Sequence, residues 1–353
     1  MFASHGRPLR GALLTLALVS GCAGLAPTES LPDLYEKARF EKTLVLYGGG
    51  PAAQYEGFAR EFERAFPGIT VSVTGGFSNV LDRKIDAQLE AGKLEVDLAI
   101  FQTLQDFLRW KKAGVLLRFK PEGFDRIDAA FKDEDGAFVG VAVHGNPYAY
   151  NPGLVRSEDV PRSAPDFLKP QFRGKLVACY PADDDATLYV FYTLVKKYGW
   201  EYVDKYMANQ PNFIQGHLGV ARSISSGANL VTLDTVARTS LAQIRAGQTH
   251  AIAFSSVDPL PVWPLTAAIF KDAPHPNAAK LYLSWYLARE QQARVGTWSS
   301  RSDVAPPEGL EPLTAYRLAN DYRDFVSDEK RLDDLRKRFE AYTGPVRATG
   351  GGR

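Results

Sequence analysis

The chain has 353 residues, of which 45% are hydrophobic and 24% are charged, a composition typical of soluble globular proteins. Its length is sufficient for about two domains. The formal net charge is +1, so electrostatics gives no reason to expect a nucleic acid as partner.

Residues 1–22 have the features of a bacterial export signal. Basic residues precede the apolar run Ala12–Val19, which is too short to span a membrane as a helix. The following Val19-Ser20-Gly21-Cys22 resembles the lipobox of bacterial lipoproteins, in which the cysteine is acylated and becomes the first mature residue. The resemblance implies that Cys22 attaches the protein to membrane lipid. Ordinary signal cleavage with an incidental cysteine is the alternative.

The chain has two cysteines. If Cys22 carries lipid, Cys179 has no disulfide partner, although an exported protein enters an oxidising compartment. Cys179 ends the apolar run Leu176–Cys179, which predicts a buried, unreactive thiol rather than a nucleophile. Residues 23–40 are interpreted as a tether between the anchor and the fold.

Three strand–helix units follow. They are the strand Thr43–Tyr47 with the helix Ala53–Phe66, the strand Ile69–Val73 with a helix capped by Ser78 or Asn79, and the strand Val96–Phe101 with the helix Leu104–Ala113. The apolar residues of the helices recur every three to four positions, and glycine or Pro-Gly ends each helix. This alternation with short loops indicates a parallel sheet with right-handed crossovers.

The stretch Phe138–Pro152 is interpreted as the place where the chain leaves one lobe and enters a second. Val139, Val141 and Val143 alternate with small residues before His144–Pro147 breaks the run. One buried strand and a turn inside a single larger domain is the alternative. Two lobes joined by crossing strands would form a cleft, where a ligand can bind.

The second half of the chain continues the α/β pattern. It predicts a strand Lys175–Cys179, helices Asp183–Tyr198, Trp200–Ala208 and Val236–Ala246, a strand His250–Phe254, a return strand Trp263–Phe270, a long helix Asn277–Val295 and a charged helical segment Leu313–Tyr342. We therefore expect an α/β fold with two lobes, each a mostly parallel sheet flanked by helices. The expected boundaries are 41–145 with about 260–300 for the first lobe, 146–259 for the second, 301–345 for C-terminal helices and 346–353 for a disordered tail.

The carboxyl ends of the predicted strands are rich in Gly, Ser, Thr, Asn and Gln. Ligands of parallel α/β sheets collect at these ends, and several ends lead directly into a helix, whose free N–H groups favour oxyanions. The candidate ligand-binding residues are Gly49, Gly50, Ser78, Asn79, Gln102, Thr103, Asp184, Thr187, Ser255 and Ser256. For one loop, ordinary turn chemistry is a sufficient explanation, but five loops at equivalent places favour a site.

Charged residues near these loops leave alternatives open. Asp183–Asp185 either complement a helix dipole or include one carboxylate that reaches into the cleft and pairs with a cationic group. Arg222 is the best candidate partner for an anionic ligand, and a solvated surface arginine is the alternative. Neither a Gly-x-Ser-x-Gly nor a His-Glu-x-x-His motif is present, and no two histidines have metal-ligand spacing. We therefore expect neither catalysis nor a cofactor nor a metal site.

Taken together, these features resemble those of bacterial ABC-transporter solute-binding proteins with the type II periplasmic-binding-protein fold, in particular the cluster of ferric-ion, thiamine and phosphonate binders. The similar segments, in order, are Thr43–Gly50, Phe62–Val73, Gln171–Pro181, Asn277–Gln292 and Arg301–Val304. The resemblance implies a hinged receptor, exported to the periplasm or cell surface, that delivers its solute to a membrane permease without catalysis. We expect a monomer.

One departure concerns the ferric ligands. The ferric binders place two adjacent tyrosines after the strand that His250–Phe254 resembles, where this chain has Ser255-Ser256-Val257. Serine hydroxyls replace phenolates poorly as ligands of Fe³⁺. Tyr148 remains a ligand-binding candidate. The leading hypothesis is capture of a small anionic or zwitterionic solute. The alternatives are a ferric-type receptor with non-standard ligands, a ligand sensor without a transporter, and a secreted hydrolase.

Overall fold

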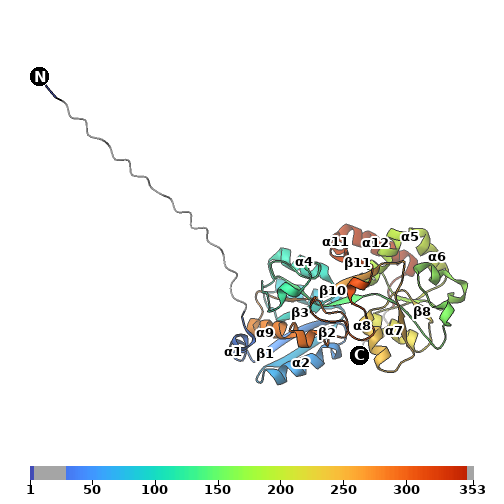
Figure 1. The fold of residues 1–353 in the computed structure, drawn as a ribbon, viewed down its shortest axis with the longest axis horizontal. Helices are drawn as coiled ribbons and strands as arrows, with labels where there is room; N and C mark the ends of the chain where they lie inside the picture. Colours follow the sequence, from blue (N-terminus) through green and yellow to red (C-terminus); the bar gives the residue numbers. More distant parts are fainter. Residues whose placement is uncertain (4–28, 348–353) are drawn as a thin grey trace.

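The computed structural model describes residues 1–3 and 29–347. The predicted signal peptide with Cys22 and most of the predicted tail lie outside the described residues. Within 29–347 the chain forms two lobes, which Figure 1 shows side by side.

The first lobe is built on a six-stranded sheet with the order β11-β10-β3-β1-β2, in which β4 also pairs with β10. The strands are β1 (Thr43–Gly49), β2 (Thr70–Gly76), β3 (Leu98–Phe101), β4 (Val139–Gly145), β10 (Leu260–Ile269) and β11 (Leu318–Ala319). β1 is parallel to β2 and β3, as the three strand–helix units predict. β10 is antiparallel to β3 and β4, so the return strand makes the sheet mixed.

Helices cover this sheet. They are α1 (Leu31–Ala38), α2 (Ala53–Ala65), α3 (Ser78–Glu90), α4 (Leu104–Ala113), α9 (Pro276–Tyr286) and α10 (Arg289–Gln292). The predicted helix Asn277–Val295 is wrong in its length, because the chain turns at Leu287-Ala288 and Ala288 is extended. The carbonyl of Leu287 accepts a hydrogen bond from Arg301, so a tertiary contact replaces a further helical bond.

The interpretation of residues 23–40 as a tether is wrong for its second half. Leu31–Ala38 forms α1, which Ser30 caps by accepting from the backbone N–H of Asp33. Leu34 and Ala38 are fully buried, and α1 packs on α9 at the outer end of the first lobe (Figure 1). A capping serine followed by apolar residues at helical spacing was the local signal.

The second lobe holds a three-stranded antiparallel sheet, with β5 (Tyr148–Tyr150) between β8 (Val231–Thr232) and β9 (Ala251–Ala253). A parallel pair joins β6 (Val177–Cys179) to β7 (Asn212–Ile214). The helices are α5 (Asp185–Tyr198), α6 (Trp200–Ala208), α7 (His217–Ser225) and α8 (Ala237–Arg245).

The chain passes between the two sheets twice. β4 belongs to the first sheet and β5 to the second, so the stretch Phe138–Pro152 connects the lobes. β10 returns from β9 to the first sheet, and it pairs successively with β11, β4 and β3. These two connections form the hinge.

The C-terminal segment is helical over only part of the predicted range Leu313–Tyr342. β11 pairs with the start of β10, and only α11 (Tyr322–Val326) and α12 (Glu329–Thr343) are α-helical. Edge pairing with β10 therefore overrides helical propensity around Leu318. α12 docks on the second lobe through Phe339, whose ring lies 5.2 Å from that of Phe191 and 5.4 Å from that of Trp200.

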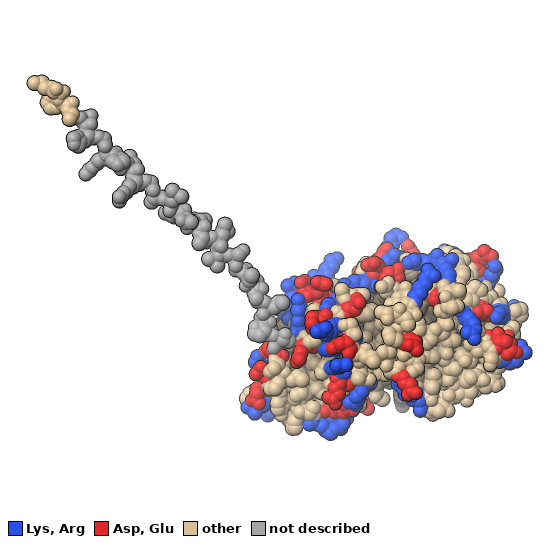
Figure 2. Space-filling view, viewed as in Figure 1, with Lys and Arg blue, Asp and Glu red and all other residues tan. Residues whose placement is uncertain are grey.

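The visible surface carries both signs of charge. Figure 2 shows Lys and Arg interspersed with Asp and Glu over both lobes, in keeping with the net charge of +1. This face has no extended basic patch of the kind that nucleic-acid binding requires.

Candidate functional site

The rim of the first lobe forms where β1, β3 and α3 meet. A Cβ added at Gly49 would lie 2.4 Å from Oγ of Ser78 and 2.7 Å from Oε1 of Gln102, so only glycine permits this approach. Ser78 donates a hydrogen bond to Gln102 over 3.0 Å, and the hydroxyl of Tyr55 donates to the carbonyl of Gly49 over 2.8 Å. Three predicted site residues thus lie together.

The start of α3 differs from the prediction. Its N-cap residue is Phe77, and no side chain caps the helix. Ser78 bonds to Gln102 instead, while Nδ2 of Asn79 donates across the lobes to Asp183 over 3.3 Å. The first N–H groups of α3 therefore have no side-chain acceptor and can donate to a ligand.

The two lobes touch along this rim. Besides Asn79 and Asp183, the amide of Gln105 on α4 donates to Asp185 at the start of α5. The ring of Phe77 lies against Gly216, which precedes α7. The N-terminal ends of α3, α5 and α7 therefore face one another, and the structure has the lobes in contact.

The three consecutive aspartates already have partners. Asp184 caps α5 by accepting from the N–H groups of Ala186 and Thr187. The other two aspartates accept hydrogen bonds from other segments. Asp183 accepts from Asn79 and Gln215, and Asp185 accepts from Gln105 and Arg336. Asp184 therefore serves the helix terminus, and the partner that Asp183 meets across the lobes is the neutral amide of Asn79 rather than a cationic group.

A buried polar cluster lies behind Asp184. The hydroxyl of Thr187 donates a hydrogen bond to Oδ2 of Asp234 over 3.0 Å. His217, the first residue of α7, has Nε2 3.1 Å from Oδ1 of Asp234 and Nδ1 3.4 Å from Oδ2 of Asp184. Burial works to lower the pKa of His217, but the neighbouring Cys179, Asp184 and Asp234 outweigh it and raise this pKa well above its usual value. The surroundings of His217 therefore favour its charged form.

Cys179 lies beside this cluster. It is 1% exposed and forms no disulfide within residues 29–347. Burial raises the pKa of its thiol to about 12, so the thiol is protonated at neutral pH. The prediction that this thiol is buried is confirmed.

Arg238 is the residue that sequence reasoning missed. It lies in the first turn of α8, a helix without a side-chain N-cap, and it is half-buried. Within residues 29–347 its guanidinium makes no hydrogen bond or ion pair that would neutralise it. A Cβ added at Gly296 of the first lobe would lie 3.9 Å from Cγ of Arg238. Burial raises the pKa of Tyr55, and the charge of Arg238 opposes that rise, so the guanidinium lies near Tyr55, whose hydroxyl donates to Gly49.

His144 lies near the end of β4, close to the connection to the second lobe. It is 9% exposed, and its Nδ1 has no hydrogen-bond partner among the described residues. Burial, together with the positive charges of Arg238 and His217, lowers its pKa to about 3. His144 is therefore neutral and offers an uncommitted polar atom next to a cation.

The remaining predicted site residues have other surroundings than the Gly49 rim and the His217 cluster. Gly50 bonds back to Gly76 through its N–H over 2.7 Å. Thr103 is buried, and its hydroxyl has no partner in the described part of the chain. Arg222 is exposed on α7. Ser256 is exposed in the connection between β9 and β10.

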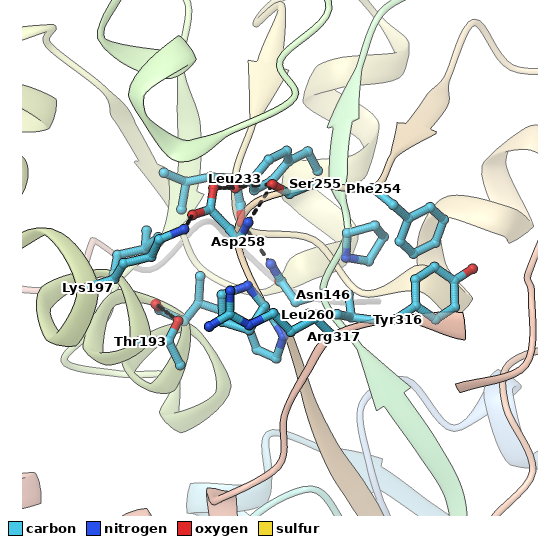
Figure 3. A pocket seen from close by; sticks show the side chains of 16 residues that line it. Asn146, Thr193, Lys197, Leu233, Phe254, Ser255, Asp258, Leu260, Tyr316 and Arg317 are labelled. Atoms are coloured by element: carbon cyan, nitrogen blue, oxygen red, sulfur yellow. Dashed lines mark hydrogen bonds and ion pairs between the residues drawn. The ribbon is translucent and has the colours of Figure 1, made fainter. Parts of the chain in front are cut away.

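Tyr148 and Ser255 belong to a second location, a hollow at the hinge (Figure 3). Both donate hydrogen bonds to the buried carboxylate of Asp258, as does the ammonium group of Lys197. Burial would raise the pKa of Asp258, but hydrogen bonds from Lys197, Tyr198, the backbone N–H of Ala164 and Tyr148 lower it below the usual value. The space open to the centre of a water-sized sphere is about 30 Å³, which holds only a water molecule or two.

The arrangement described so far, two lobes with helix N-termini and an uncommitted arginine facing the gap between them, agrees with the comparisons with known proteins. The sequence profile described as "Bacterial extracellular solute-binding protein" matches residues 48–293, which is more than half of the chain. The chain belongs to this family. No curated protein matches the sequence.

Solved structures of solute-binding proteins share the fold of this family member. One is iron-bound HitA from Pseudomonas aeruginosa, with 19% identity, a TM-score of 0.69, and coverage of 84% of this chain and 99% of that one. Another is the periplasmic binding protein AfuA from Actinobacillus pleuropneumoniae with fructose-6-phosphate bound, with 17% identity, a TM-score of 0.73, and coverage of 86% and 99%. A substrate-binding protein of an ABC transporter from Agrobacterium tumefaciens has 14% identity, a TM-score of 0.72, and coverage of 85% and 94%.

These comparisons confirm the predicted α/β two-lobed type II fold and the predicted solute-binding family. The family is one of binding proteins rather than enzymes. Hydrogen bonds from His144 to both a carboxylate and a serine would favour the hydrolase alternative, and within residues 29–347 this histidine makes neither bond.

Proposed function

We propose that this solute-binding protein captures a small anionic solute between its lobes and delivers it to the permease of an ABC importer. The observation that carries the proposal is the guanidinium of the half-buried Arg238, which has no partner among the described residues and lies near Tyr55 of the Gly49 rim. A cation that is partly removed from water is stabilised by an anion.

The balance of donors and acceptors in the cleft supports an anion. The carboxylates of Asp183, Asp184, Asp185 and Asp234 already accept hydrogen bonds from protein groups. Several groups without a protein acceptor are donors, namely Arg238 and the uncapped N-termini of α3, α7 and α8. A phosphorylated or carboxylated solute supplies the matching oxygens.

The tyrosines weigh against a ferric site of the kind predicted as an alternative. Tyr148 donates its hydroxyl to Asp258, and burial together with this carboxylate raises its pKa. Burial also raises the pKa of Tyr55. Binding Fe³⁺ through phenolates requires deprotonated tyrosines, which these surroundings disfavour.

The solute changes the shape of the protein by favouring closure of the two lobes. Asn79 and Gln105 already bridge to the second lobe, and a solute that contacts Arg238 and the Gly49 rim at once adds contacts only when the lobes are together. Such a solute shifts the population toward the closed form. Mass spectrometry of the protein purified gently from its host identifies the co-purified solute. We expect an anion, and a solute without negative charge would contradict the proposal.

Export and lipid attachment complete the proposal. In residues 1–3 and 29–347, no helix is both long and apolar enough to cross a bilayer. We propose that residues 1–22 direct export to the periplasm or cell surface and that acylated Cys22 holds the monomer at a membrane. Labelling of cells with a radioactive fatty acid should mark the protein, and the Cys22→Ala variant should be unlabelled. Equal labelling of both would contradict the anchor.

A further inference from the structure

We infer that Cys179, Asp184 and His217 form a binding site for a divalent transition-metal cation of borderline softness, such as Zn²⁺. One ligand atom from each of these residues lies within 4.8 Å of the other two. The inference does not depend on the anionic solute, and it concerns a group of side chains that the capture of an anion leaves unexplained.

The distance between Asp184 and His217 fits coordination better than hydrogen bonding. Nδ1 of His217 is 3.4 Å from Oδ2 of Asp184, whereas a charge-assisted hydrogen bond is usually about 2.7–2.9 Å long. Two ligand atoms about 2.0–2.1 Å from a tetrahedral zinc ion lie about 3.3–3.4 Å apart. The two atoms are therefore spaced like two ligands of one ion.

The other atoms of these side chains are held in the orientation that a metal ligand needs. Nε2 of His217 is 3.1 Å from Oδ1 of Asp234, which reproduces the carboxylate–histidine–metal relation of zinc sites. Oδ2 of Asp234 is fixed by the N–H of Cys179 and by Thr187. Oδ1 of Asp184 caps α5, so Oδ2 remains for the cation.

The three side chains supply the donor atoms that such a cation prefers. Zn²⁺ binds thiolate sulfur, imidazole nitrogen and carboxylate oxygen. On binding, the proton on Sγ of Cys179 and any proton on Nδ1 of His217 leave for solvent, and the sulfur and nitrogen lone pairs form the bonds to the metal.

The cation can enter from the cleft. The side chains of His217 and Asp184 are 12% and 18% exposed, whereas Cys179 is 1% exposed. Three protein ligands leave the fourth tetrahedral position for water or another oxygen ligand.

The test uses the full chain with Cys22→Ser, in which Cys179 is the remaining cysteine, after treatment with a chelator and in the absence of added solute. Titration with Co²⁺ should produce a thiolate-to-cobalt charge-transfer band that Zn²⁺ abolishes. Zinc binding should release protons to the buffer. Cys179→Ala should remove the band, and Asp234→Asn should weaken Zn²⁺ binding about 10–100-fold.

His275→Gln is the matched control, because His275 also pairs with a buried aspartate, Asp97, but lies in the first lobe away from Cys179. This variant should retain the band. His217→Gln, with its melting temperature checked without metal, covers the case in which Cys179→Ala does not fold. A cobalt complex without a thiolate band, or a band that survives Cys179→Ala, would overturn the site. Binding of the anionic solute by metal-free protein is measured separately, so the two proposals can fail independently.

Discussion

Replacing Arg238 by Gln tests which arginine holds the solute. Glutamine keeps much of the length and polarity of the side chain but removes its charge. A hydrogen bond to a charged group contributes about 1.5–3 kcal/mol, which corresponds to a loss of affinity of about 10–150-fold. The half-buried position of Arg238 limits screening by water, so the effect should persist at physiological salt.

The assay is isothermal titration calorimetry with the solute identified by mass spectrometry, and Arg222→Gln is its control. Arg222 is the arginine that the sequence favours, but it is exposed on α7 of the same lobe, so its replacement should leave affinity nearly unchanged. The reasoning is refuted if Arg222→Gln weakens binding more than Arg238→Gln does, or if neither variant differs from the wild type.

Three further predictions concern stability, each measured by urea unfolding. Leu34→Ala should lower the free energy of unfolding by about 2–5 kcal/mol, because α1 is part of the packed fold, and a tether would give no change. Phe339→Ala should cost about 3–5 kcal/mol, since the ring is buried between Phe191 and Trp200, and a small loss would mean that α12 is not docked. Burial lowers the pKa of His144 from 6.5 to about 3, so the folded state binds fewer protons than the unfolded state. Stability should therefore fall as the pH drops from about 6.5 toward 3, by roughly 3–5 kcal/mol from this residue, and His144→Asn should show a shallower fall. An unchanged acid dependence in that variant would contradict the burial argument.

The first lobe was predictable because its signals are local. The helix Leu104–Ala113 has an apolar face and ends at Gly114, and the structure gives the same bounds. The strand Thr43–Tyr47 and the turn at Gly48–Gly50 are likewise set by short-range chemistry. Ser78 and Gln102 could be placed near Gly49, because all three lie at the carboxyl ends of neighbouring parallel strands. Gly49 ends β1, Ser78 follows β2 and Gln102 follows β3.

The second-lobe side of the site was less accessible to sequence reasoning. Arg238 follows β8, which has two residues and is too short to produce an alternating pattern, so its carboxyl end was not recognised as a ligand loop. His217, Asp184 and Asp234 come from three separate loops, and no spacing rule connects them. Tyr148 and Ser255 were placed at the ligand by analogy of position, whereas the packing around Asp258 places them at the hinge.

The central claim is that two lobes close on a small anionic solute through contacts with both. Small-angle X-ray scattering of the protein, stripped of bound solute and then supplied with the co-purified one, tests it most directly. The account predicts a smaller radius of gyration on addition of the solute and no such change for Arg238→Gln at the same concentration. An unchanged radius of gyration in the wild type, at a concentration where calorimetry shows binding, would contradict it.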